Sequence, residues 1–339
     1  MKAVLDAIRF GCLVVLLPLL TGGLFRGLYA EITQSGYAEA AGLTAAAAAP
    51  AGEKIHFLDT GSGDAILLES NGHFALVDAA EDAKNLHIAS DKGYEDYLLR
   101  YIKKIAGDEN GKVHLDFVLG THSHSDHIGC FDTVLLDPDI TADKAYLRRY
   151  TAAGKLDYEL SWDNQEMYDD MLAACAAKGI PVIADMPKEG FALGDFTVTI
   201  KNGEYDPDPA NNSGDENDNS MGVLVEAHGK RAFLAGDINN LSGDEIRLAR
   251  EIGRVDLLKA GHHGYGGSSE MEFVVGLRPQ TVVYTNNPGG PSAEVMRRFA
   301  FIANSKQYVT GDFGGVLALF AEEEAISLYA IGDYETQNQ

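Results

Sequence analysis

The sequence predicts an α/β protein in which two β-sheets lie between layers of helices. From Lys54 onward, short runs rich in β-forming residues alternate with segments of helical periodicity. The chain is long enough for a large core, with 339 residues of which 45% are hydrophobic. Length alone would also allow two small domains, but the sequence contains no repeat at a fixed period, and the alternation favours a single core. We therefore expect one domain over residues 53–339.

The N-terminal residues have the layout of an export signal. Lys2 and Arg9 precede a short apolar stretch that ends near residue 20, and small residues follow. We predict a signal peptide over residues 1–30, with an uncleaved membrane anchor as the alternative, and then an alanine-rich linker over residues 31–52. These features predict an extracellular or cell-surface protein, with N-terminal membrane association as a further option.

The predicted strands and helices follow each other along the rest of the chain. Each strand is a short apolar or alternating run bounded by turn residues such as GSGD and SNG. Each helix repeats its apolar residues at helical spacing, and the clearest one ends at Gly179 with Pro181 just beyond. The expected strands comprise residues 55–61, 65–70, 73–79, 115–120, 146–150, 196–200, 221–227, 231–237, 255–261, 279–286, 314–320 and 326–331. The expected helices comprise residues 95–105, 163–179, 242–252 and 292–304.

The composition limits the classes of partner. The formal net charge is −24, from 51 acidic and 27 basic residues, and an acidic surface repels phosphate backbones, so nucleic acid is a disfavoured partner. No sequence feature indicates a protein partner. The three cysteines, Cys12, Cys130 and Cys175, form no disulfide framework, and Cys130 is expected to be a small buried residue. The acidic segment 203–219 could bind calcium, but its spacing favours a solvated flexible loop.

Metal-ligating side chains gather where three buried strands are expected to end. The first strand runs into THSHSDHIG, residues 121–129, which holds three histidines and an aspartate. The second ends at Asp237 and the third at His262 and His263. Functional groups of open sheets lie beyond the carboxyl ends of the strands, so we expect the three ends to meet at one edge. A histidine-rich surface loop is the alternative, but few structural roles need four ligating residues in six.

The spacing within HSHSDH suits two metal ions. In an extended segment His122 and His124 point the same way, because side chains alternate with a period of two, so both can bind one cation. Asp126 and His127 can turn toward a second cation in a tightening loop, and the carboxylate of Asp237 can bridge both. Nitrogen and oxygen ligands of this kind suit zinc, with manganese or iron as alternatives. We therefore expect two divalent metal ions as cofactors, with zinc (Zn2+) preferred over Mn2+ or Fe.

At these residues the chain resembles the metallo-β-lactamase superfamily, which carries His-x-His-x-Asp-His at a strand end. IHFLDTGSGDAILLESNGHFALVDA and AGHHG are similar to its ComEC-type branch. DAILLESNGHFALVD, LDFVLGTHSHSDHIG, WDN, DNSMGVLVEAHGKRAFLAGDINN and RVDLLKAGHH resemble more closely the catalytic module of the teichoic-acid phosphorylcholine esterases. The likeness covers roughly residues 54–285. It implies a four-layer αββα sandwich, the metallo-β-lactamase fold, and an exported binuclear-metal hydrolase.

The resemblance also implies a role for each motif residue. Asp126, Asp237 and His262 would be the catalytic residues, with Asp237 bridging the two ions and His262 facing the substrate phosphate. Asp78 would orient the histidine-rich loop. Sequence alone leaves open which of His262 and His263 binds metal. Unlike many members of the superfamily, this chain has no further histidine in its acidic segment, so one ion has fewer protein ligands. The implied metal ligands are His122, His124, Asp126, His127, Asp237 and His263.

The esterase resemblance implies a phosphodiesterase acting on a small-molecule or cell-surface phosphodiester of the phosphorylcholine type. A quaternary ammonium group binds to aromatic faces and negative charge, which makes Trp162, Asp163 and Tyr265, together with His262, the candidate substrate residues. A structural role for Trp162, with Asp163 capping a helix, is equally compatible with the sequence. The alternative functions are a ComEC-like DNA nuclease and another hydrolase of the same fold, such as a lactonase. A metal-binding protein without catalysis ranks last.

Overall fold

The structure is a computed structural model, and it describes residues 43–46, 49, 51–84, 92–322 and 324–332. The predicted signal peptide over residues 1–30 and most of the predicted linker lie outside these ranges. Among the described residues, no helix combines the length and the apolar character that crossing a bilayer requires.

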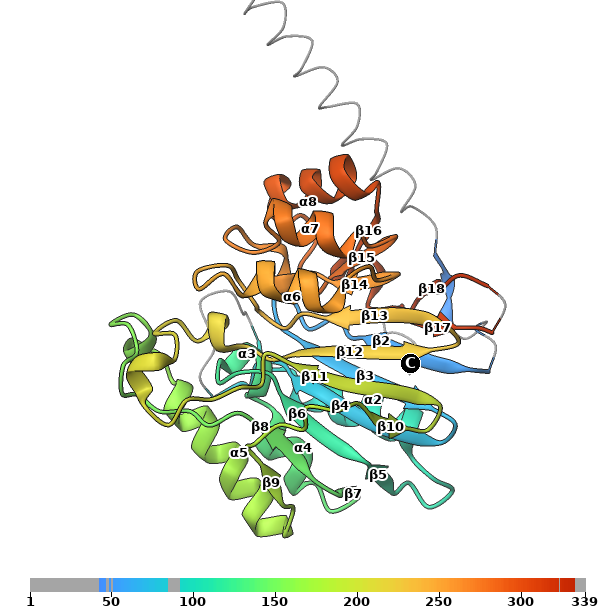
Figure 1. Ribbon diagram of the computed structural model, residues 1–339. Coiled ribbons are helices and arrows are strands. Elements are labelled where there is room, and N and C mark those ends of the chain that lie inside the picture. Colours follow the sequence, from blue (N-terminus) through green and yellow to red (C-terminus); the bar gives the residue numbers. More distant parts are fainter. Residues whose placement is uncertain (1–42, 47–48, 50, 85–91, 323, 333–339) are drawn as a thin grey trace, which may run out of the picture.

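Two β-sheets form the centre of the molecule (Figure 1). The larger sheet contains, in spatial order, β1 (Thr44–Ala45), β18 (Ser327–Ala330), β17 (Val316–Phe320), β2 (Glu53–Phe57), β3 (Ala65–Ser70), β4 (His73–Ala79), β6 (Phe117–Gly120), β8 (Ala145–Leu147) and β9 (Val182–Ile183). The turn between β3 and β4 is made by Asn71 and Gly72, which both have positive φ, as a two-residue hairpin turn requires. From β4 to β9 the strands are parallel, so they end at one edge of the sheet.

The smaller sheet contains β10 (Phe191–Leu193), β11 (Phe196–Lys201), β12 (Gly222–Ala227), β13 (Lys230–Leu234), β14 (Leu257–Lys259), β15 (Thr281–Tyr284) and β16 (Lys306–Val309), in that spatial order. The strands β13 to β16 are parallel. Strands covered on both faces need apolar residues at nearly every position, which explains runs such as Leu257-Leu258 and Val282-Val283. A separate pair, β5 (Val113–Leu115) and β7 (Ile140–Ala142), lies beside the larger sheet.

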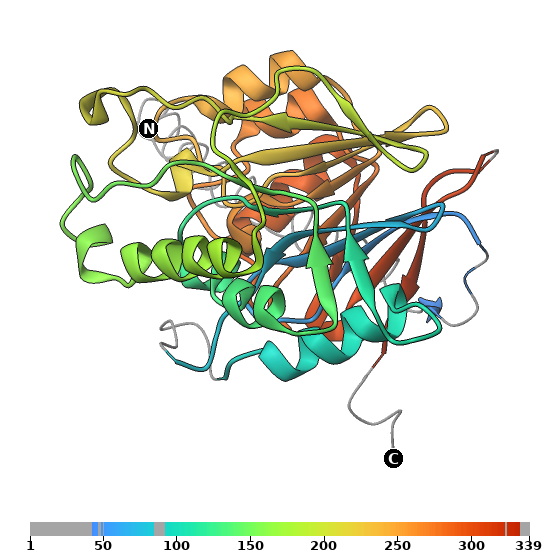
Figure 2. The same cartoon turned by 90° about the horizontal axis from the view of Figure 1, so that it is seen from below.

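Helices cover the outer face of each sheet, which gives the four layers seen in Figure 2. The helices α2 (Glu95–Ala106), α4 (Phe131–Leu136) and α5 (Asn164–Lys178) pack on the larger sheet. The helices α6 (Asp244–Ile252), α7 (Met271–Leu277) and α8 (Ala293–Arg298) pack on the smaller one. A third apolar core fills the space between the sheets. The αββα sandwich, which is the metallo-β-lactamase fold, is therefore confirmed.

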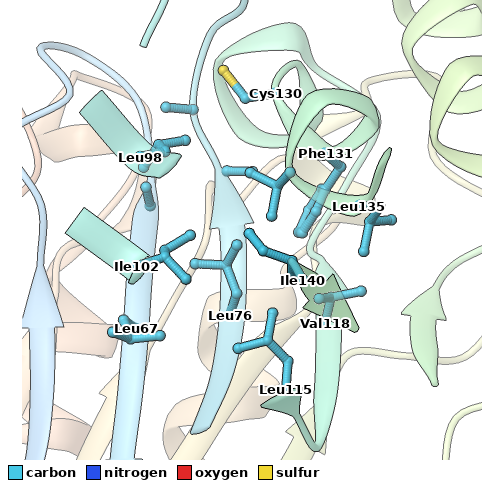
Figure 3. Close-up of a cluster of buried hydrophobic side chains, with 14 of the residues drawn as sticks. Leu67, Leu76, Leu98, Ile102, Leu115, Val118, Cys130, Phe131, Leu135 and Ile140 are labelled. Carbon is cyan, nitrogen blue, oxygen red and sulfur yellow. The ribbon is translucent and has the colours of Figure 1, made fainter. Parts of the chain in front are cut away.

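The core under the first helical layer shows how sequence periodicity becomes packing (Figure 3). Leu98 and Ile102 lie one turn apart on α2 and are fully buried. They pack into the same cluster as Leu67 of β3 and Leu76 of β4, because side chains alternate along a strand and these two point to the face that the helices cover. Cys130 is also fully buried in this cluster, which confirms its predicted role as a small core residue.

Several predicted strands are shorter than expected. The strand predicted over 146–150 ends at Leu147, because Arg148 leaves the sheet to donate hydrogen bonds to the carbonyl oxygens of Glu204 and Asn219. The strand predicted over 231–237 ends at Leu234, since Gly236 has a φ of +52°. Within the predicted linker, Thr44–Ala45 pairs with β18 in parallel.

The acidic segment differs from the solvated loop that its composition predicts. Its second half, Asp215 to Asn219, is buried. The side-chain amide of Asn219 donates to the carbonyl oxygens of Ser213 (2.9 Å) and Asp215 (3.0 Å). The backbone N–H of Glu216 donates to the carboxylate of Glu159 (2.8 Å). The prediction of a flexible loop is therefore wrong for this half, because short polar side chains satisfy the buried backbone here.

Glu245 on α6 makes stability depend on pH. It is fully buried, and its carboxylate accepts hydrogen bonds from the backbone N–H groups of Ser269 and Glu270. Burial is the main cause that raises its pKa from 4.5 to about 7. Between these values the unfolded chain releases the proton and the folded chain keeps it, so the free energy of unfolding falls as pH rises.

We expect this decrease to reach about 3 kcal/mol and to be much smaller in the Glu245→Gln variant. Denaturant unfolding of both proteins at about pH 5 and about pH 8 measures it. Equal pH dependence in the two proteins would refute the prediction.

Candidate metal centre

The three predicted strand ends meet at one edge of the two sheets. The histidine-rich segment follows β6 and forms the short helix α3 (Ser125–Ile128), which is a helical turn where a loop was expected. Asp237 follows β13, and the 3-10 turn η5 (Gly261–Gly264) follows β14. A hydrogen bond from the Met221 N–H to the Thr121 carbonyl oxygen (2.9 Å) ties the two sheets together beside the site.

Backbone strain marks the same edge. His262 and His263 are consecutive residues in left-handed conformations, with φ of 49° and 50°. Asp78, at the end of β4, has a φ of 56°. Gly236 is required next to Asp237, because a Cβ atom there would lie 2.3 Å from the Ser220 hydroxyl. Non-glycine residues with positive φ each cost free energy, and they concentrate at functional sites.

Four of the predicted ligands form a compact buried group. The Nε2 atom of His127 lies 3.1 Å from Asp237 Oδ1, and the Nε2 atom of His263 lies 3.2 Å from Asp237 Oδ2. The two Nε2 atoms are 3.2 Å apart. Asp126 completes the group, with its Oδ2 atom 3.3 Å from Nε2 of His263. Two imidazole nitrogens and two carboxylates at such distances match the donor set that zinc prefers.

The other two predicted ligands, His122 and His124, lie directly beside this group. Their rings are 4.5 Å apart between centroids, and the ring of His122 is 4.2 Å from that of His127. Both side chains are buried. The structure therefore brings together all six residues that the sequence predicts as ligands, while their role in binding metal stays a prediction.

Each of the four imidazoles has one nitrogen held by a neighbour. His127 is held at Nδ1 by Asp78 (2.8 Å), and His263 is held at Nδ1 by Thr285 (3.1 Å). His122 is held at Nδ1 by Thr121 (3.0 Å), and His124 is held at Nε2 by Glu159 (3.0 Å). Such contacts orient a metal-binding histidine and leave its other nitrogen for the ion.

The fit of a metal is supported by a buried polar atom that the rest of the site does not satisfy. The Nε2 atom of His122 is buried and has no hydrogen-bond partner among the described residues. A buried imidazole nitrogen without a partner costs free energy in a folded protein. A cation shared with His124 would remove this cost, so the residues present fit a metal at this position.

Electrostatic interactions shift several pKa values within the site. Burial opposes ionisation of Asp237, but His127, His263 and Lys259 hold the pKa of its carboxyl well below the ordinary value. Burial also opposes a charge on His127, but Asp237 raises the pKa of this imidazole well above its ordinary value. Burial, together with His127, lowers the pKa of His122 well below 6.5, so this ring is neutral. Cation binding would therefore displace protons from imidazoles of the compact buried group, such as that of His127.

Asp78 supports the histidine-rich segment, as the resemblance implies. Its carboxylate accepts hydrogen bonds from the backbone N–H (2.7 Å) and the hydroxyl (2.8 Å) of Thr121. The same carboxylate contacts His127. Asp78 therefore fixes both the start of the segment and one of its imidazoles.

Three residues of the site were not predicted from the sequence. Asp64 contacts Nδ1 of His263 (3.3 Å) and is paired with the buried ammonium group of Lys259 (2.5 Å). One of its carboxylate oxygens also lies within 4.8 Å of ligand atoms of His127, Asp237 and His263. Because Lys259 and His263 already contact Asp64, we regard Asp64 as a residue that supports the metal ligands and not as a ligand itself. Glu159 is the third such residue.

The predicted substrate residues lie at the more exposed side of the centre. His262 has its Nε2 atom 4.0 Å from Asp237 Oδ2, and its side chain is 30% exposed. The ring of Trp162 lies 4.9 Å from that of His124 and is partly exposed. The ring of Tyr265 lies 5.5 Å from that of His262. Asp163 is the N-cap residue of α5, although its side chain forms no capping hydrogen bond in the described structure.

Comparison with known proteins gives a distant relative and several similar structures. The chain is 24% identical over 173 residues to ComE operon protein 3 of Bacillus subtilis (strain 168), which covers 51% of this chain but only 20% of that protein. The metallo hydrolase Igni18 of Ignicoccus hospitalis is 17% identical, covers 80% of this chain and 100% of its own, and has a TM-score of 0.45. Zn2+-bound PqqB of Methylobacterium extorquens is 12% identical, with coverages of 76% and 97% and a TM-score of 0.44.

A protein family also matches the chain directly. The family described as "Beta-lactamase superfamily domain" matches residues 73–266. The match spans more than half of the chain and contains the histidine-rich segment, Asp237 and both histidines of η5. The chain therefore belongs to the beta-lactamase superfamily domain family, as a hydrolase of the metallo-β-lactamase fold with a buried candidate metal site.

Proposed function

We propose that this protein is a phosphodiesterase that holds two divalent metal ions and acts on phosphodiesters of the phosphorylcholine type. The observation that carries the proposal is the set of four imidazoles around Asp126 and Asp237. Each imidazole has one nitrogen held by a neighbour that is not a predicted ligand, while the other nitrogens of His127 and His263 face Asp237 and that of His122 has no hydrogen-bond partner among the described residues. A structural histidine cluster would not need this pattern at every ring.

The residues of the site have different roles in the proposed reaction. Two divalent ions at such a centre supply a water of lowered pKa and neutralise charge that grows on a phosphoryl group. The carboxylate of Asp237 contacts His127 and His263, which would hold one ion, and its charge also acts on the neighbouring His122, which would hold the other, so Asp237 would be a ligand that the two ions share. His262 is partly exposed and close to Asp237, so it can donate a hydrogen bond to a phosphoryl oxygen.

The surroundings of the centre support a cationic group on the substrate. Trp162 lies next to His124, and Tyr265 lies next to His262, so aromatic faces are present on two sides of the site. Quaternary ammonium groups bind to such faces. The formal net charge of −24 attracts a cationic group and repels a polyanion. In this proposal the protein is exported and meets its substrate at the cell surface.

A DNA nuclease is the second candidate, because the chain is similar to ComE operon protein 3 over 173 residues. The net charge argues against it, since binding to DNA depends on neutralising phosphates with basic residues. A lactonase-type hydrolase would use the same centre.

One comparison of substrates separates these functions. The rates on p-nitrophenylphosphorylcholine, bis-p-nitrophenyl phosphate, single-stranded DNA and a lactone are measured with the zinc-loaded protein. We expect the choline ester to be cleaved at least about tenfold faster than the bis ester, which corresponds to about 1.4 kcal/mol of preference. Equal rates on these two esters would contradict choline recognition. A preference for DNA or for the lactone would support the other candidates.

Trp162 provides a direct test of the cationic group. Trp162→Ala should raise KM for the choline ester about tenfold, in the range of a cation–π contact, and leave KM for the bis ester unchanged. The matched control is Phe301→Ala, which removes an aromatic ring that is 66% exposed on the helical turn η6 (Phe299–Ala303). Equal effects of Trp162→Ala on both esters would show a structural role instead.

A further inference from the structure

Glu159 is a buried carboxylate that joins three parts of the site. It lies at the start of the turn η2 (Glu159–Ser161) and is only 1% exposed. Its Oε2 atom contacts Nε2 of His124 (3.0 Å) and accepts a hydrogen bond from the side-chain amide of Asn164 (2.8 Å). Its Oε1 atom accepts a hydrogen bond from the backbone N–H of Glu216 (2.8 Å). A metal-ligand candidate, the first residue of α5 and the acidic segment therefore share one carboxylate.

The contact with Glu159 decides which nitrogen of His124 can bind a cation. A carboxylate only accepts hydrogen bonds, so the Nε2 atom of His124 must carry its proton. In the neutral ring, which is the form that binds a metal, Nδ1 is then the nitrogen with a free lone pair. His122 has the opposite arrangement, because Thr121 contacts its Nδ1 atom and leaves Nε2. A carboxylate that orients a metal-binding imidazole also makes it a stronger ligand.

The same carboxylate holds the residues that border the substrate side. Trp162 follows three residues after Glu159, and its ring packs edge-on against His124. Glu216 precedes Asn217, whose side-chain amide lies 3.4 Å from Nε2 of His262. Two further contacts lock these segments together, one between Tyr158 and Asp215 and one between Lys155 and Glu216. Movement of Glu159 would therefore disturb His124 and both bordering segments together.

We infer that Glu159 is a positioning residue for His124, and that tight binding of the cation shared by His122 and His124 depends on its carboxylate. The inference rests on the proposed two-metal centre. The cation held by Asp126, His127 and His263 does not depend on Glu159 in this way, because Asp78, Thr285 and Asp64 hold those imidazoles. Loss of Glu159 should therefore affect one of the two ions.

The variant Glu159→Gln tests this selectivity, because it keeps the size of the side chain and removes the charge. Zinc binding to the full-length protein is followed by competition with a chromogenic chelator, without any substrate. We expect two ions to bind to the wild-type protein. In the variant, one ion should bind about 10- to 100-fold more weakly while the other keeps its affinity, as is typical for a residue that supports a metal ligand.

The matched control is Glu69→Gln. Glu69 contacts the buried His56 at Nε2 with a distance of 2.9 Å, which is the same kind of pair, on β2 and β3 of the larger sheet. The control should lose stability in a comparable way and keep both zinc affinities. A change of zinc affinity in the control would show that a general loss of stability is responsible, and would overturn the inference.

A double-mutant cycle with His124→Asn shows whether Glu159 acts through His124. If it does, Glu159→Gln causes no further loss of zinc affinity in a chain that already lacks His124. An equal loss in both backgrounds, or two unchanged affinities in Glu159→Gln, would overturn the inference while leaving the two-metal hydrolase intact. Fewer than two ions on the wild-type protein would contradict the proposed function, and this inference with it.

Discussion

Replacing Asp237 with alanine will lower turnover by about a thousandfold or more, which corresponds to about 4 kcal/mol of transition-state stabilisation. Its carboxylate contacts the Nε2 atoms of His127 and His263, which would hold one ion, and its charge also acts on His122, which would hold the other. Without it, the two ions would lose their shared ligand. The fold should persist, because Lys259 keeps its ion pair with Asp64 and its hydrogen bond to the carbonyl oxygen of Gly236.

The control for this variant is Asp256→Ala. Asp256 precedes β14 and accepts a hydrogen bond from the backbone N–H of Arg231 (2.9 Å), at the end of the strands away from the centre. We expect this control to keep its activity and to lose only stability. Both variants are compared by phosphodiesterase rate and by circular dichroism. Wild-type activity in a folded Asp237→Ala protein would refute the proposed mechanism.

His262 and His263 should have separable roles. His263 is buried with Nε2 in the ligand group and Nδ1 held by Thr285, so His263→Ala should lose one metal ion and nearly all activity. His262 is partly exposed and lies 4.0 Å from Asp237, so His262→Ala should keep both ions. Its rate should fall by about 100- to 1,000-fold, as is typical for the loss of one donor to a developing anion.

Metal content by inductively coupled plasma mass spectrometry and rates on the choline ester distinguish the two variants. The control is His114→Ala, which removes an exposed histidine from β5. Loss of an ion from His262→Ala, with both ions retained in His263→Ala, would reverse the assignment. This result would place the substrate contact on His263.

The sequence could predict that these residues gather at one place, because its signal is local. His122, His124, Asp126 and His127 lie within six residues, and the strand before them is apolar until it ends. A parallel sheet then places the ends of β13 and β14 side by side, so Asp237 and His263 become neighbours without any further sequence signal. The predicted layers are confirmed for the same reason, since strand and helix periodicities are properties of short windows.

The supporting residues could not be predicted in this way, because their partners are distant in the chain. Glu159 and His124 are separated by 35 positions, and nothing in the sequence around Glu159 predicts that the side chain is buried. Lys259 does carry a weak signal, since a lysine in the apolar run VDLLKAG needs a buried anion. Its partner, Asp64, is identified only from the structure. The sequence did not predict that half of the acidic segment is buried, because amino-acid composition gives the charge of a segment and does not give its hydrogen bonds.

The most direct test of the two-metal centre is an anomalous diffraction measurement at the zinc edge on crystals of the full-length protein grown with zinc. We predict two peaks within coordination distance of Asp237, one contacting His122 and His124 and the other contacting Asp126, His127 and His263. A single peak that does not touch Asp237, or no peak among these residues, would contradict the two-metal account.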